Sequence, residues 1–258
     1  MTITSQAEMT AMLKAGQAVQ TAFKAMKAAT KPGISTAALD QIGAQVLNEW
    51  GARSAPQLYY DFPGATCISV NEQAAHGIPS PDRVLAAGDM INIDVSANLE
   101  GYVADMGQSF VVLDEGESAD GGAAELHREQ ARICAAVEEA VLAAIARVHS
   151  GCNLNVIGEA VQEVADREGY QIVRNLGSHG VGASIHEEPS YVPYDNPQET
   201  RRLAKGTALT IEPFFCTGTD WVDEEDDGWT LSVPSGCLVA QFEHTVVVTD
   251  SGAVVITG

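Results

Sequence analysis

The chain has few basic residues for its size. Its 258 residues include 14 Lys and Arg against 35 Asp and Glu, which gives a formal net charge of −21 at pH 7. Proteins that bind phosphate backbones or anionic membranes need a positively charged surface. This balance argues against a nucleic acid or a membrane as partner, and suits a soluble protein that attracts cationic ligands. We expect a monomer.

Long apolar runs and a signal sequence are also missing. No stretch approaches the roughly 20 apolar residues that cross a bilayer. The first residues, Met-Thr-Ile-Thr-Ser-Gln-Ala-Glu, lack the basic and then apolar order of a signal peptide. The five cysteines are scattered and form no C-x-x-C pair, which argues against a disulfide framework or a zinc knuckle. We therefore expect a cytoplasmic protein with reduced thiols.

Apolar residues make up 45% of the chain, which is ample for a hydrophobic core. They recur at helical spacing over residues 9–26 and 39–47, and again in a long helix that opens at Gly121-Gly122 and in a fourth helix between Gly151 and Gly169. A β-type pattern follows each pair of helices. The order is therefore two helices and then strands, twice over.

This order indicates an internal duplication. An offset of 118 residues aligns two pairs of glycines and carries Asp94, in Ile-x-Ile-Asp, onto Glu212, in Leu-Thr-Ile-Glu. Matching acids in matching contexts favour duplication over chance. The halves would span about 1–117 and 118–258, and no Pro-, Gly- or Ser-rich linker separates them. We predict a single domain, 1–258, of mixed α/β class, with a sheet layer backed by helices.

Asp94 lies in a segment, residues 90–95, that alternates as a half-buried strand does. A turn with Leu99 and Glu100 as its loop residues would place Asp94 opposite Asp105 on the returning strand. Two carboxylates this close repel each other unless a cation lies between them. A divalent metal ion bound between them is therefore the natural expectation. Two solvated hairpin acids are the alternative reading of this pair alone.

Two further strand patterns each place an acid, Glu212 and Glu243, among apolar residues, where acids are usually avoided. His179 and His186 lie in a glycine-rich segment, and glycines on both sides of His179 allow its ring to point into a site. His76 lies in a turn-rich segment. A lone histidine is more often packed than a ligand, but several histidines beside several acids favour a metal centre.

Several of these residues belong to short motifs: Cys67-Ile68-Ser69-Val70-Asn71-Glu72, His76-Gly77-Ile78-Pro79, Ile93-Asp94-Val95, Asp105, His179-Gly180-Val181-Gly182, His186-Glu187-Glu188-Pro189, Ile211-Glu212-Pro213, Asp227-Gly228-Trp229-Thr230 and Gln241-Phe242-Glu243-His244-Thr245. In order and spacing they resemble the methionine aminopeptidases of the short bacterial type (type I), over nearly the whole chain. Ser178 departs from the pattern, because the family usually has a glycine there. The resemblance implies the duplicated pita-bread fold, a central, largely antiparallel sheet backed by helices in two pseudo-symmetric halves.

The resemblance also implies a dinuclear metal centre. Asp94 would bind one metal ion, His179 and Glu212 the other, and Asp105 and Glu243 would bridge the two. Four carboxylates and one imidazole favour Mn, Fe(II) or Co(II), with Zn as an alternative.

The implied enzyme is a metalloaminopeptidase that removes the N-terminal methionine of nascent proteins and peptides when the second residue is small. A metal-bridging hydroxide would attack the first peptide bond, with Glu212 as the proton shuttle. His76 and His186 would bind the peptide and stabilise the oxyanion or the leaving amide. The methionine pocket would be lined by Tyr59, Phe62, Cys67, Ile185 and Trp229.

Two alternatives stay open. An Xaa-Pro aminopeptidase of the same fold would share the metal centre, although such relatives generally carry an additional N-terminal domain. A non-catalytic binding protein on this scaffold would typically have lost ligands, whereas all five are present here. The acidic run 223–227 is expected to be a solvated hairpin tip. The alternative is a functional one, in which the run attracts the ammonium group of a substrate.

Overall fold

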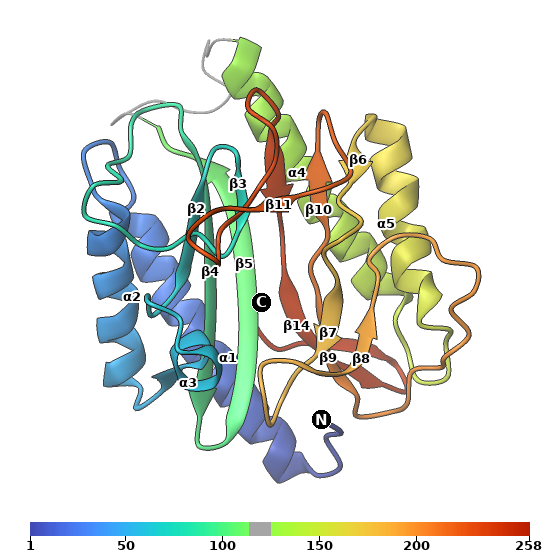
Figure 1. Cartoon of the computed structure of the whole chain (residues 1–258). Coiled ribbons are helices and arrows are strands. Elements are labelled where there is room, and N and C mark those ends of the chain that lie inside the picture. The colour runs from blue at the N-terminus through green and yellow to red at the C-terminus, as the bar shows by residue number, and fades with distance from the viewer. Residues whose placement is uncertain (114–124) are drawn as a thin grey trace.

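The computed structural model describes residues 1–113 and 125–258 (Figure 1). The predicted helix start at Gly121-Gly122 lies outside these residues. The helices are α1 (Gln6–Ala29), α2 (Thr36–Glu49), α3 (Ala55–Tyr60), α4 (Glu125–Arg147) and α5 (Asn155–Glu168). The strands are β1 (Arg53–Ser54), β2 (Cys67–Val70), β3 (Gln73–Ala75), β4 (Met90–Leu99), β5 (Tyr102–Val111), β6 (Gln171–Ile172), β7 (Ser178–Gly180), β8 (Glu187–Tyr191), β9 (Ala208–Ile211), β10 (Phe214–Cys216), β11 (Asp223–Glu224), β12 (Leu231–Ser232), β13 (Val239–Gln241), β14 (His244–Thr249) and β15 (Gly252–Val255).

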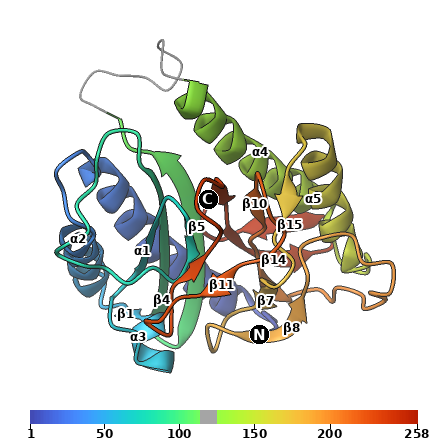
Figure 2. The ribbon, with the colours of Figure 1, turned by 45° about the horizontal axis from the view of Figure 1, so that its top comes forward.

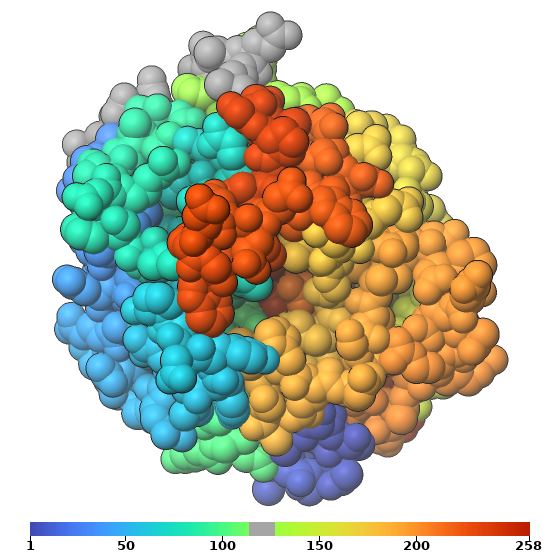
Figure 3. Space-filling view, viewed as in Figure 1, coloured from blue at the N-terminus to red at the C-terminus, as the bar shows by residue number. Residues whose placement is uncertain are grey.

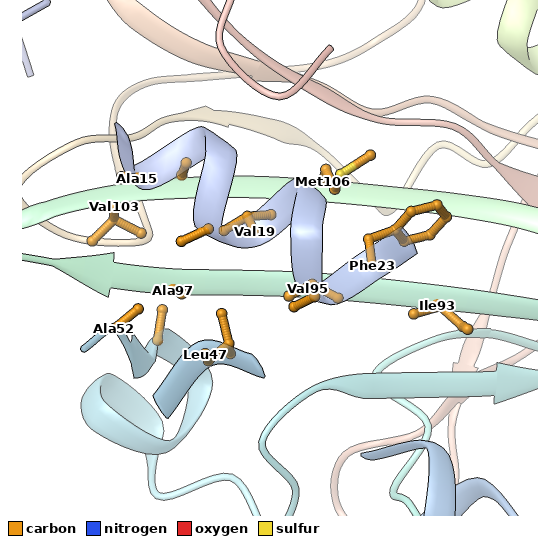
Figure 4. Close-up of a cluster of buried hydrophobic side chains, with 14 of the residues drawn as sticks. Ala15, Val19, Phe23, Leu47, Ala52, Ile93, Val95, Ala97, Val103 and Met106 are labelled. Carbon is orange, nitrogen blue, oxygen red and sulfur yellow. The ribbon is translucent and has the colours of Figure 1, made fainter. Parts of the chain in front are cut away.

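The first half is a four-stranded antiparallel sheet covered by α1 and α2. Strands β1, β4 and β2 lie in that order, and β5 pairs with β4 as a long hairpin. Helix α1 begins at a capping box, in which the Ser5 hydroxyl accepts from the Glu8 amide and the Glu8 carboxylate accepts from the Ser5 amide. Its apolar face, including Val19 and Phe23, packs on both strands of the hairpin (Figure 4).

The second half repeats this plan. A five-stranded sheet of order β15-β14-β9-β7-β8 and a three-stranded sheet of order β13-β10-β6 are backed by α4 and α5. Figures 1 and 2 show the two helix pairs on the outer sides of the molecule, with the strands of both halves between them. Within residues 1–113 and 125–258, no helix has the length and apolar character needed to span a bilayer.

The element bounds agree with the predicted duplication. Shifted by 118 positions, β1 falls on β6, α2 falls within one residue of α5, and β4 falls on β9 and β10. The glycine that precedes the second helix of each half, Gly33 or Gly151, has a positive φ of 88° or 86°. Only glycine adopts that conformation without strain. The two halves therefore share a glycine turn before the second helix as well as the apolar pattern.

The predicted loop of the β4–β5 hairpin lies one residue too early, so the predicted pairing of the two strands is wrong by two residues. Leu99 pairs with Tyr102, and the loop residues are Glu100 and Gly101, with φ of 53° and 91°. A two-residue hairpin loop of this type needs positive φ at both positions, which glycine accepts and Leu99 does not. Asp94 therefore pairs with Gly107, and Ser96 pairs with Asp105. The two acids are diagonal neighbours on one face, which still brings their side chains together.

Strand β5 also joins the two halves. The amide of Asp105 donates to Thr245 Oγ1 at 2.9 Å, and the Thr245 hydroxyl donates back to the Asp105 carbonyl at 2.8 Å. The Val103 amide donates to the Gly182 carbonyl at 2.6 Å, and Gln108 forms a bridge with Phe242. The candidate ligands lie along this seam, because the strands that carry them meet there.

Candidate metal centre

The structure brings all five predicted metal ligands into one buried cluster. Each comes from a different strand or from a residue next to one: Asp94 from β4, Asp105 from β5, His179 from β7, Glu212 directly after β9 and Glu243 directly before β14. One ligand atom each from Asp105, His179 and Glu243 lie within 4.8 Å of one another. The Nε2 atom of His179 lies 3.1 Å from Oε1 of Glu212.

Burial makes this cluster of carboxylates hard to ionise. It raises the pKa of Asp94 to about 6 and the pKa of Glu212 to about 8. The pKa values of Asp105 and Glu243 are raised well above their usual range by burial and then by the neighbouring carboxylates. Four buried acids that repel one another when ionised would be stabilised by a bound cation.

The donor atoms fit a divalent metal ion. Asp105 Oδ1 and Glu243 Oε1 are buried and have no hydrogen-bond partner among the described residues. Burial and the nearby His186 lower the pKa of His179 to about 4, so its imidazole is neutral at pH 7. Its Nδ1 lies 3.0 Å from the Gly180 carbonyl, an acceptor that keeps the proton on Nδ1 and leaves Nε2 free to coordinate. A bound ion would give these two carboxylate oxygens and the His179 Nε2 atom a coordination partner.

Polar neighbours fix two of the carboxylates. Thr210 Oγ1 donates to Glu212 Oε1 at 2.6 Å, and Gln241 Nε2 donates to Glu243 Oε2 at 3.0 Å. The Gln241 Oε1 atom in turn accepts from Asn92 Nδ2 at 2.8 Å. Such outer contacts orient metal ligands and set their affinity. The alternation of the Gln241 strand put this side chain on the face of Glu243, but its partner on β4 could not be inferred from local pattern.

The serine at 178 has a visible role. Its Oγ accepts from the backbone amide of Glu212 at 3.3 Å, and the side chain is almost fully buried. A glycine here would leave that amide without this acceptor. The departure from the family pattern therefore adds a contact to the strand end that carries a candidate ligand.

A cavity of about 250 Å³ lies over the cluster. Figure 3 shows a hollow between the cyan surface of α3, the orange-red surface around β11 and the yellow surface of the segment after β7. Phe62 and Trp229 meet edge to face in its wall, with ring centroids 5.2 Å apart. The residues that line it are Pro56, Tyr60, Phe62, Cys67, His76, Asp94, Ser96, Asp105, His179, Ile185, His186, Glu212 and Trp229.

Tyr59 is not among the cavity-lining residues, and Tyr60 is there instead. The Tyr59 hydroxyl donates to the Ala183 carbonyl at 2.9 Å and accepts from Asn98 Nδ2 at 3.0 Å. Successive residues of a helix point about 100° apart, so the two adjacent tyrosines of α3 point in different directions. The sequence does not fix the rotation of a helix this short, so it could not tell which tyrosine faces inwards.

Both predicted substrate-binding histidines line the cavity. The His186 ring stands edge to face against His179, with centroids 4.3 Å apart, and burial lowers its pKa. Burial and then His186 lower the pKa of His76. His76 also holds a positive φ of 55°, an uncommon conformation for a residue other than glycine and one that is often kept at functional sites.

The sequence profile of metallopeptidase family M24 matches residues 10–250. This chain belongs to metallopeptidase family M24. The family resemblance drawn from the motifs is thereby confirmed, together with the pita-bread fold.

Relatives within family M24 cover almost the whole chain. Methionine aminopeptidase 2 of Bacillus subtilis is 41% identical over 258 residues, which are 100% of this chain and 99% of the relative. The methionine aminopeptidase of Escherichia coli K12 is 36% identical over 247 residues, 95% and 89% of the two chains. The crystal structure of methionine aminopeptidase from Thermotoga maritima matches with a TM-score of 0.90 at 29% identity, covering 100% and 99%.

A prolidase from Pyrococcus furiosus matches with a TM-score of 0.74 at 24% identity, over 99% of this chain but 65% of the prolidase. At that identity the likeness shows a common fold alone. The proline-specific alternative therefore shares the M24 scaffold, but it gains no support for its specificity.

Proposed function

We propose that this M24 chain is a metalloaminopeptidase that removes the N-terminal methionine of peptides and nascent proteins when the second residue is small. The observation that carries the proposal is the complete cluster of four carboxylates and one imidazole beneath a cavity with an aromatic and apolar wall. The full-length relatives named methionine aminopeptidase support the same activity.

The cluster would hold two divalent ions, with Asp94 on one, His179 and Glu212 on the other, and Asp105 and Glu243 shared. Carboxylates and a single imidazole suit Mn, Fe(II) or Co(II), and Zn is the alternative. When bound, such ions supply Lewis-acid polarisation and an activated water nucleophile.

The side chains of the chain itself bind and orient the peptide. Phe62, Cys67, Ile185 and Trp229 form an apolar wall of the cavity, which suits the unbranched thioether of methionine. His76 and His186 line the cavity, and their lowered pKa values keep them neutral at pH 7; in this proposal they donate to the carbonyl of the first peptide bond and to the charge that develops on it. Glu212 lines the same cavity, with Oε1 3.1 Å from Nε2 of His179, and its carboxylate is the proposed proton shuttle.

The test is release of the first residue from Met-Ala-Ser and Ala-Pro-Ser peptides. Metal-stripped protein would receive Mn, Fe(II), Co or Zn singly, with Asp105→Ala as the control. Metal-dependent release of methionine that the variant lacks is the expected result. Cleavage of the proline peptide alone would instead identify the protein as an Xaa-Pro aminopeptidase. If neither peptide is cleaved with any of the metals, a non-catalytic binding protein would be favoured.

We also propose that the protein is cytoplasmic and monomeric and binds no nucleic acid. The net charge of −21 supports the last point, because it repels phosphate backbones. Light scattering during size-exclusion chromatography, with and without ribosomes at physiological salt, tests both the monomer and the absence of a ribosome complex.

A further inference from the structure

We infer that Tyr60 is a positioning residue for His186: its hydroxyl donates to Nδ1 of the imidazole, so that the ring proton stays on Nε2 and is presented to the cavity. The inference rests on the proposed function in one respect, that the substrate meets His186 there. It adds to that function a residue whose role no catalytic motif of the sequence indicates.

The contact joins two side chains that both line the cavity. Tyr60 is the last residue of α3 in the first half, and His186 precedes β8 in the second half. The hydroxyl oxygen of Tyr60 lies 2.5 Å from Nδ1 of His186, and the ring centroids are 5.4 Å apart. In the part of the chain that the structure describes, no other residue forms a hydrogen bond with the His186 ring.

The chemistry of the pair sets the direction of the hydrogen bond. A neutral imidazole nitrogen is a far better acceptor than a phenol oxygen, and a phenol O–H is a good donor. The proton between the two groups therefore belongs to the tyrosine, and the imidazole carries its own proton on Nε2. A protonated Nε2 can donate to the carbonyl oxygen of a peptide, whereas the other tautomer offers only a lone pair.

The neighbouring tyrosine provides a matched control. Tyr59 also reaches the second half, but its hydroxyl donates to the backbone carbonyl of Ala183 at 2.9 Å, three residues before His186. The two tyrosines thus hold the same loop, one through its backbone and the other through the imidazole. Removing each hydroxyl separates a general loosening of the loop from a specific effect on the ring of His186.

The first experiment reads the tautomer without reference to activity. Two-bond ¹H–¹⁵N spectra of metal-free, histidine-labelled protein distinguish protonated from unprotonated ring nitrogens, and His186→Asn assigns the signals. We expect an unprotonated Nδ1 in the wild type, a mixture of tautomers in Tyr60→Phe and the wild-type pattern in Tyr59→Phe. A protonated Nδ1 in the wild type, or an unchanged spectrum in Tyr60→Phe, would overturn the inference.

The second experiment measures methionine release by the metal-loaded enzyme. Tyr60→Phe should lower kcat about two- to tenfold with little change in KM, because one hydrogen bond that orients a transition-state donor is lost. A fall confined to KM, or no change in kcat, would contradict a positioning role. If the wild type releases no methionine, the proposed function fails, while the tautomer measurement still decides the inference about Tyr60.

Discussion

Gln241 is not itself a candidate ligand, but the affinity of the metal centre should depend on its side chain. Its amide nitrogen holds Glu243 Oε2 at 3.0 Å, its amide oxygen accepts from Asn92 at 2.8 Å, and it is 2% exposed. Gln241→Leu keeps the approximate volume and removes both contacts. Asn92 keeps a second partner, Ser109 Oγ at 3.2 Å, so the main loss falls on Glu243.

The size of the effect follows from that one contact. A hydrogen bond to a charged group contributes about 1.5–3 kcal/mol, and loss of an outer partner of a ligand typically costs about 10- to 100-fold in metal affinity. The two figures agree, since a tenfold change corresponds to about 1.4 kcal/mol. We therefore expect the dissociation constant for Mn to rise about 10- to 100-fold in Gln241→Leu, as measured by calorimetric titration of metal-free protein.

A second buried glutamine gives the matched control. Gln130 on α4 is also 2% exposed, and its amide nitrogen donates to the Gly88 carbonyl at 2.9 Å, away from the cluster. Gln130→Leu should lower the free energy of unfolding and leave metal affinity unchanged. Gly107→Ala should weaken metal binding as Gln241→Leu does, because its Cβ would lie 2.3 Å from Gln241 Oε1. Equal metal affinity in wild type and Gln241→Leu, or an equal loss in Gln130→Leu, would refute the reasoning.

Three further predictions concern the ligands and the fold. Asp105→Asn removes a candidate bridging carboxylate, so metal analysis by mass spectrometry should find at most one ion per chain. Without metal, the folded pKa values of about 6 for Asp94 and about 8 for Glu212 exceed the unfolded 3.8 and 4.5, so the folded state binds more protons. The free energy of unfolding in urea with chelator should therefore fall as pH rises from 5 to 8, and added Mn should remove the trend; a flat profile would contradict this. Gly158→Ala places a Cβ 2.1 Å from the Tyr194 carbonyl and should lower the free energy of unfolding by about 1–3 kcal/mol in thermal or urea denaturation, with metal affinity unchanged.

The sequence was most informative where structure depends on local pattern. Helical spacing and glycine punctuation predicted the repeat, because Gly33 and Gly151 occupy positions that only glycine accepts without strain. The alternation around Asp94 and Glu212 predicted strands with an acid on one face. Motifs with fixed spacing predicted which residues would come together, although no short-range rule would have joined Asp94 to Glu243.

The errors arose where a small geometric choice decides the outcome. The register of β4 and β5 depends on which two residues take positive φ, and the structure uses Glu100 with Gly101 rather than Leu99 with Glu100. The choice between Tyr59 and Tyr60 depends on the rotation of a six-residue helix. The contact of Gln241 with Asn92 depends on how two sheets approach each other across the seam, which the sequence pattern does not specify.

The seam between the two halves gives a bound ion a role beyond chemistry. Asp94 and Asp105 come from the first half, whereas His179, Glu212 and Glu243 come from the second. An ion held by both sets is a reversible crosslink between chain segments up to 149 positions apart. Free ion at 100 times its dissociation constant would strengthen the folded state by about 2.7 kcal/mol. A chain in which only one half has folded would offer one set of ligands and bind metal weakly. Tight metal binding would therefore accompany the correct packing of the two halves against each other.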